Sequence, residues 1–78
     1  MEETFKDLIF DLNLYGLNIN DAENFHIDKS GFCNIHFDNI FLSEKIKSNL
    51  LFFEYNITEW VSYTEYLNNN KKIQLIFI

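Results

Sequence analysis

Apolar side chains in the first fifteen residues recur at the spacing of an amphipathic helix. These side chains are Phe5, Leu8, Ile9 and Leu12. Positions three or four residues apart share one face of a helix. Glu2 and Glu3 suit the positive end of the helix dipole, and Gly16 suits the left-handed residue that often ends a helix. The pattern therefore predicts a helix over residues 2–15.

Residues 24–38 alternate between apolar and polar side chains on both sides of a turn. The segment Asp28-Lys29-Ser30-Gly31 matches a type I turn followed by a bulge, with Gly where φ must be positive. This loop places Ile27 opposite Cys33 and His26 opposite Asn34. One face then carries Phe25, Ile27, Cys33, Ile35 and Phe37, and the other carries His26, Asp28, Asn34, His36 and Asp38. A loop one residue shorter would mix the two faces, so the clean separation predicts an antiparallel hairpin at residues 24–38.

Residues 43–57 fit two structures. Ile46, Leu50 and Phe53 have the spacing of a helix that begins near Ser43. The odd-numbered residues 51–57, however, are apolar and alternate with their neighbours as in a strand. Because Phe and Tyr favour strands, we expect a strand over residues 50–56.

The remaining sequence predicts a helix followed by a strand. Trp60, Tyr63 and Leu67 recur at helical spacing behind Glu59, which suits the first turn of a helix. We therefore expect a second helix near residues 58–68. Residues 73–78 are apolar on both faces apart from Gln74, the pattern of a strand that is buried on both sides, inside the sheet or at a dimer seam.

Together these elements predict one small acidic α+β domain over residues 1–78. It has an N-terminal helix, a small antiparallel sheet of about four strands, a second helix and a C-terminal strand. A chain of 78 residues builds a single core, and its one cysteine cannot form an internal disulfide. With 47% hydrophobic residues on so small a body, some apolar surface should stay exposed, which favours association with a partner or with a second copy.

No part of the sequence has the pattern of an export signal or a membrane span. The start, Met1-Glu2-Glu3, lacks the basic residues of a signal peptide. The longest apolar runs are four residues, whereas a membrane-spanning helix needs about 20. We therefore expect a cytoplasmic protein that does not bind membranes.

His26, Cys33 and His36 are the residues that raise the question of metal binding or nucleophilic catalysis. The predicted register separates them, because both histidines lie on the polar face and Cys33 on the apolar face. A structural zinc site needs four converging ligands, and only Asp28 or Asp38 is near enough to add one. The chain also lacks a P-loop, a dinucleotide fingerprint and a nucleophile elbow. We expect no metal, no cofactor and no enzymatic activity.

Charge indicates the expected kind of partner. The sequence contains twelve acidic residues and six basic residues, all lysines, which gives a net charge of −6. This balance opposes direct binding to nucleic acid and favours a basic protein partner. Glu3, Asp7 and Asp11 recur every four residues and form one stripe on the predicted helix, although a solvated helix face is the simpler explanation. The candidate partner-binding residues are Glu3, Asp7, Asp11, Asp28, Asp38, Glu59, Trp60, Tyr63 and Glu65.

In size, charge and aromatic content the chain resembles the small acidic inhibitors that phages make against host nucleases, including anti-CRISPR proteins. It is similar in the same properties to immunity proteins and antitoxins that cap a toxin nuclease. No shared motif carries either resemblance, so neither assigns a role to a residue. Residues with AT-rich codons dominate the composition, as in a low-GC bacterium or its phage, which would place the protein in the host cytoplasm.

The resemblance implies an inhibitor of a basic, nucleic-acid-handling enzyme such as a nuclease or a CRISPR effector, acting as a nucleic-acid mimic. Carboxylates would steer the encounter, and aromatic rings would anchor the complex. The alternative from a different class is a structural domain that associates with itself as a homodimer.

Overall fold

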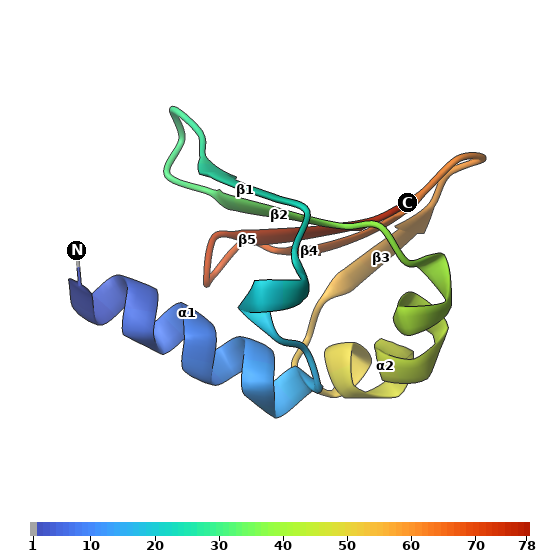
Figure 1. Ribbon diagram of the computed structural model, residues 1–78, viewed down its shortest axis with the longest axis horizontal. Helices are drawn as coiled ribbons and strands as arrows, with labels where there is room; N and C mark the ends of the chain where they lie inside the picture. Colours follow the sequence, from blue (N-terminus) through green and yellow to red (C-terminus); the bar gives the residue numbers. More distant parts are fainter. Residues whose placement is uncertain (1) are drawn as a thin grey trace.

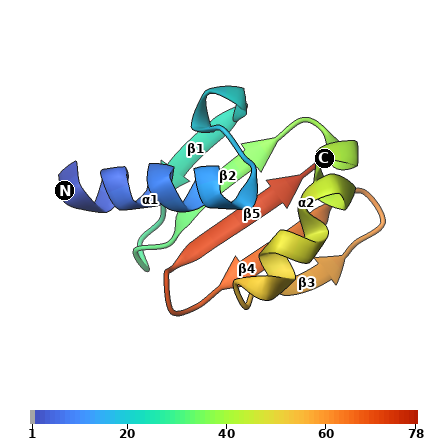
Figure 2. The ribbon, with the colours of Figure 1, turned by 90° about the horizontal axis from the view of Figure 1, so that it is seen from below.

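A five-stranded sheet forms one layer of the protein, and two helices form the other (Figure 1). The computed structural model describes residues 2–78, and the surroundings of side chains from residue 6 onward. The elements are α1 (Glu2–Tyr15), a short 3-10 turn (Ile19–Asp21), β1 (Asn24–Ile27), β2 (Cys33–Phe37), α2 (Ile40–Phe52), β3 (Asn56–Glu59), β4 (Thr64–Asn68) and β5 (Ile73–Phe77). Both helices lie on the same face of the sheet, α1 over β1 and β2 and α2 over the half that contains β4 (Figure 2).

The strand order is β1-β2-β5-β4-β3. The last strand of the chain, β5, lies at the centre, parallel to β2 and antiparallel to β4. Leu75 of β5 is fully buried beneath the helices, and Ile76 on the other face is also buried. The α+β class and the buried C-terminal strand are therefore confirmed, whereas the sheet is mixed and has five strands instead of about four antiparallel ones.

The predicted N-terminal helix is confirmed, and it ends as its sequence indicates. Gly16 follows the helix with a φ of +94°. The backbone N–H of Leu17 donates to the carbonyl of Leu12 at 2.8 Å, and that of Gly16 donates to Asn13 at 3.1 Å. This is the Schellman arrangement, and the buried pair Leu12 and Leu17 supplies its usual apolar contact.

The predicted hairpin at residues 24–38 is also confirmed. Ile27 pairs with Cys33 and His26 with Asn34 in the expected register. Gly31 has a φ of +87°, and its backbone N–H donates to the carbonyl of Asp28 at 3.1 Å. The alternating pattern and the turn residues were sufficient here because all the contacts that decide this hairpin are local in sequence.

The prediction of a strand over residues 50–56 is wrong, because residues 50–52 form the end of α2, residues 53–55 connect it to the sheet, and only Asn56 belongs to a strand. The Asn39 side chain caps the helix and accepts hydrogen bonds from the backbone N–H groups of Phe41 and Leu42 at 3.1 and 3.2 Å. The helical spacing of Ile46 and Leu50 decides the structure, since both are buried under the sheet. Of the apolar residues that suggested alternation, Leu51 is exposed on α2, whereas Phe53 and Tyr55 reach the core from the segment between α2 and β3, and Ile57 does so from β3.

The prediction of a helix near residues 58–68 is wrong as well. This segment forms β3, a turn and β4, with Ile57 paired to Tyr66 and Glu59 to Thr64. Tyr66 is the buried aromatic residue of the segment, and it lies next to Leu75 of the central strand. Pairing with β5 supplies β4 with hydrogen-bonding partners that a sequence pattern does not reveal, and the β-branched and aromatic residues of the segment favour strands.

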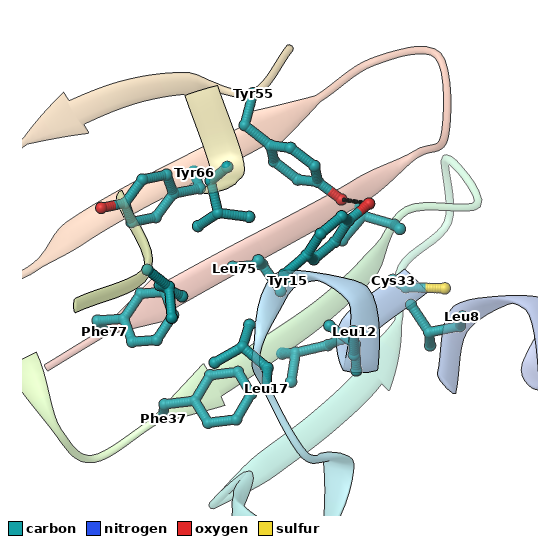
Figure 3. Close-up of a cluster of buried hydrophobic side chains, with 14 residues drawn as sticks. Leu8, Leu12, Tyr15, Leu17, Cys33, Phe37, Tyr55, Tyr66, Leu75 and Phe77 are labelled. Atoms are coloured by element: carbon teal, nitrogen blue, oxygen red, sulfur yellow. Dashed lines mark hydrogen bonds between the residues drawn. The ribbon is translucent and has the colours of Figure 1, made fainter. Parts of the chain in front are cut away.

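Aromatic rings and aliphatic side chains together fill the core between the layers (Figure 3). The Tyr55 hydroxyl donates to the Tyr15 hydroxyl at 3.0 Å, with the two rings edge to face. Burial raises the pKa of both phenols, so both stay neutral. Phe77 stacks on Phe37 and meets Tyr66 edge to face, so these rings connect β2, β5 and β4 on the buried face of the sheet.

Candidate functional site

The residues that raised the question of metal chemistry lie on two faces of the sheet. The rings of His26 and His36 are 6.1 Å apart on the face that the helices leave uncovered. Cys33 lies on the helix-covered face and is 8% exposed, and burial raises the pKa of its thiol. Within residues 2–78 there is no group of three or more metal-ligating side chains. In the same part of the chain, no helix is long and apolar enough to span a bilayer.

The predicted acidic stripe of α1 borders a groove. Asp7 and Asp11 line this groove of about 230 Å³ together with Leu8, Cys33, Lys71 and Ile73. The Lys71 ammonium lies 2.9 Å from Asp11, whose side chain is only 17% exposed, and this hydrogen bond raises the pKa of Lys71. The side chain of Glu3 lies outside the described residues. Asp11 is therefore an ion-paired groove residue, and Asp7 is the exposed carboxylate beside it.

Asp28 and Asp38 lie at opposite ends of β2 and do not form a common surface. The Asp28 carboxylate accepts hydrogen bonds from the backbone N–H groups of Ser30 and Phe32 at 2.9 and 3.0 Å, and from the Asn34 amide at 3.2 Å. These bonds, with that from Phe32 foremost, lower the pKa of Asp28. Asp28 thus has a structural role in the first hairpin, whereas Asp38 is exposed between β2 and α2.

The remaining predicted residues come together at one end of the second hairpin. Glu59, Trp60, Tyr63 and Glu65 all lie within residues 59–65, which we call the β3–β4 end. The Trp60 backbone N–H donates to the Tyr63 carbonyl at 2.8 Å, and the two rings lie 6.1 Å apart. Trp60 is 55% exposed, and Val61 is fully exposed at the tip. Sequence reasoning missed Val61, because a valine in a predicted helix gave no reason to single it out.

A cavity of about 300 Å³ lies between α2 and this hairpin, and we call it the α2 cavity. It is lined by Ile40, Ser43, Glu44, Lys47, Glu59, Thr64 and Tyr66. The Lys47 ammonium lies 3.2 Å from the Glu59 carboxylate, and both side chains are largely exposed. The hydroxyl groups of Ser43 and Tyr66 form a hydrogen bond at the buried side of the cavity, with 2.8 Å between their oxygen atoms. Sequence reasoning missed the α2 residues, since only the tertiary fold brings that helix to the hairpin.

A second group of exposed apolar residues lies on the helical layer. Phe10 and Leu14 are four residues apart on the outer side of α1. Phe52, at the end of α2, is 79% exposed. Its neighbour Phe53 contacts Tyr15 at 5.0 Å between ring centroids, so the end of α2 lies against the end of α1. We call Phe10, Leu14 and Phe52 the helical patch.

No protein-family model, curated protein or solved structure matches this chain. The chemistry of the site therefore has to be judged from its geometry. The β3–β4 end combines exposed aromatic and aliphatic side chains with carboxylates. Such a surface can bind another macromolecule, because aromatic side chains supply contact area and flanking charges supply orientation.

Proposed function

We propose that this protein is a protein-binding inhibitor of a basic, nucleic-acid-handling enzyme, and that it docks through the β3–β4 end. The observation that carries the proposal is the exposure of Trp60 and Val61 at the tip of a hairpin. Neither side chain belongs to the hydrophobic core. A turn is usually polar, so an apolar tip needs a reason outside the fold, and contact with a partner supplies one.

The charge of the chain supports the choice of a basic partner. The net charge of −6 attracts a positively charged surface and speeds the encounter with it. Glu59 and Glu65 lie in the same hairpin as the Trp60 and Tyr63 rings, so a partner that binds the β3–β4 end meets carboxylates as well as rings. Enzymes that handle nucleic acids carry such basic surfaces. An acidic protein on this surface keeps the nucleic acid away, which is how a nuclease or a CRISPR effector of the host would be inhibited by a phage protein.

The test starts from capture of the partner and ends with its activity. The wild-type chain is used as bait in the lysate of an AT-rich bacterium at low and high salt, and the captured enzyme is then purified and assayed. We expect an enzyme that is released by salt and inhibited by the wild-type chain. Trp60→Ala should weaken inhibition at least about tenfold, the effect of losing one hot-spot residue.

Phe10→Ala is the matched control, since Phe10 is an exposed aromatic residue on a different surface. It should leave inhibition unchanged. An enzyme that is inhibited equally by the wild type and by Trp60→Ala would contradict docking through the β3–β4 end. A captured enzyme that keeps full activity would contradict inhibition itself.

The helical patch supports a second candidate function, a structural domain that forms a homodimer. Exposed apolar patches often mark association surfaces, and Phe52 and Phe10 are among the most exposed large side chains of the described residues. Sedimentation at low and high salt separates the two candidates. A dimer held by the patch should persist at high salt and dissociate on Phe52→Ser, whereas the electrostatic complex with a basic enzyme should weaken as salt screens its charges.

A further inference from the structure

We infer that the α2 cavity is a socket for an arginine side chain of the basic partner. The inference rests on the proposed function and adds to it the chemical group that the partner inserts. The cavity is lined by two carboxylates and one ammonium group, from Glu44, Glu59 and Lys47. Its lining therefore has a net charge of −1, complementary to one further cation.

The Lys47 ammonium group already lies beside the Glu59 carboxylate, so the cavity accommodates a positively charged group. Lys47 approaches Glu59 to 3.2 Å, but both side chains are about half or more exposed, so the pair is weak. Glu44 forms no ion pair among the described residues. An incoming guanidinium group can therefore bind Glu44, replace Lys47 at Glu59 and leave the Lys47 ammonium in solvent.

The polar floor of the cavity is organised before a ligand arrives. The Tyr66 hydroxyl donates to the Ser43 carbonyl at 3.2 Å and lies 2.8 Å from the Ser43 hydroxyl. No buried side-chain nitrogen or oxygen atom in the described part of the chain lacks a hydrogen-bond partner. The polar groups of the floor therefore already have partners before a ligand enters, and Thr64 and Ile40 complete the lining, with Ile40 as an apolar surface for methylene groups.

Arginine fits this lining better than lysine. Its planar guanidinium group has five donors in a fixed fork, which suits two carboxylates and neighbouring hydroxyl oxygens at once. Its methylene stem packs on apolar surface such as that of Ile40. Lysine offers a single compact charge, and Lys47 already supplies that charge at Glu59.

The position of the cavity connects it to the exposed rings. Glu59 directly precedes Trp60, and Thr64 directly follows Tyr63. Glu59 ends β3 and Thr64 begins β4, and the backbone hydrogen bond from Trp60 to Tyr63 continues their pairing by one step. Successive side chains of such a ladder point to opposite faces, so the cavity and the rings lie on the two sides of the same hairpin end. A partner that binds around the β3–β4 end therefore contacts both the rings and the cavity, and it inserts an arginine on the α2 side.

The probe is N-acetyl-arginine amide, titrated into the isotopically labelled full chain and followed by backbone amide chemical shifts. We expect saturable shifts at Glu44, Glu59 and Thr64, and none with N-acetyl-norleucine amide. Glu44→Gln should weaken binding roughly three- to fivefold, the effect of one partly exposed ion pair. Lys47→Gln should strengthen it, because Glu59 loses its competing cation.

Glu54→Gln is the matched control, since it removes an exposed carboxylate outside the cavity, and it should leave binding unchanged. Equal effects of Glu44→Gln and Glu54→Gln, or shifts that do not saturate, would overturn the inference. Trp60→Ala separates the two proposals, because it should weaken inhibition of the enzyme at least about tenfold and leave binding of the arginine probe intact. If Trp60→Ala weakens inhibition in this way while Glu44→Gln alters neither measurement, the socket is refuted and the proposed function stands.

Discussion

The two hairpins at the edges of the sheet differ in the residues and hydrogen bonds that form their turns. The β1–β2 turn is polar, and the carboxylate of Asp28 accepts hydrogen bonds from two backbone N–H groups within it. Gly31 takes the positive φ that the turn requires. The β3–β4 turn instead exposes Trp60 and Val61, and only the backbone bond between Trp60 and Tyr63 closes it.

This difference separates a structural turn from a candidate binding surface. The first turn satisfies its own polar groups, so the fold alone explains its residues. The second turn exposes apolar area that adds nothing to the core, and exposed aromatic and aliphatic side chains gain their stabilisation only when another molecule covers them. Substitutions in the two turns should therefore affect different properties, stability in the first and binding in the second.

The largest expected effect comes from the strand that joins the two hairpins. Leu75 is fully buried and pairs with Ile35 of β2 and Tyr66 of β4. Leu75→Ala should lower the free energy of unfolding by about 2–5 kcal/mol, measured by urea denaturation. Amide exchange should accelerate in both hairpins together. Loss of protection in one hairpin alone would show that the halves of the sheet unfold independently.

Gly31→Ala tests the first turn. A side chain at a φ of +87° is strained even though the nearest atom to its Cβ, Cδ of Lys72, is at an ordinary 3.8 Å. We expect the free energy of unfolding to fall by about 1–2 kcal/mol. Val61→Ser in the second turn is the counterpart, and it should change stability by less than about 0.5 kcal/mol while weakening enzyme inhibition. Equal destabilisation by both would contradict the contrast between the turns.

Glu54→Gly extends the comparison to the segment between α2 and β3, which leads into the second hairpin. Glu54 has a φ of 66° after α2, where the first hairpin uses glycine at its own left-handed position. Its carboxylate also lies at the negative end of the helix dipole. The substitution should stabilise the protein by about 0.5–1 kcal/mol in thermal or urea unfolding. Glu54→Gln removes only the charge, so it should give a smaller gain.

The smallest expected effect is a dependence of the first turn on pH. Hydrogen bonds, chiefly from Phe32, hold the pKa of Asp28 below its ordinary value of 3.8. The stabilisation from this carboxylate is therefore present above pH 3.8 and is lost as the pH falls through the lowered value. The amide signals of Ser30 and Phe32 should titrate in that acidic range. Asp28→Asn should remove the transition.

Sequence patterns indicate contacts between residues that are close along the chain, and this limited the prediction of the candidate site. Trp60 and Tyr63 could be named because aromatic residues are frequent anchors of protein interfaces. Their neighbours Glu44 and Lys47 could not, because these residues belong to α2 and reach the hairpin only through the packing of the helix on the sheet. The acidic residues could be counted but not placed, and the structure distributes Asp7, Asp28 and Asp38 over separate surfaces.

The sequence by itself determined the elements whose contacts are local. These are α1 with its glycine cap, the β1–β2 hairpin with its turn, and a C-terminal strand too apolar to face water on either side. Only the tertiary structure decided between helix and strand for residues 40–68. Apolar side chains in that segment satisfy both periods, and the choice depends on which of them meet the core. Leu50 does so from α2, and Tyr66 does so from β4, where it pairs with a central strand that comes later in the chain.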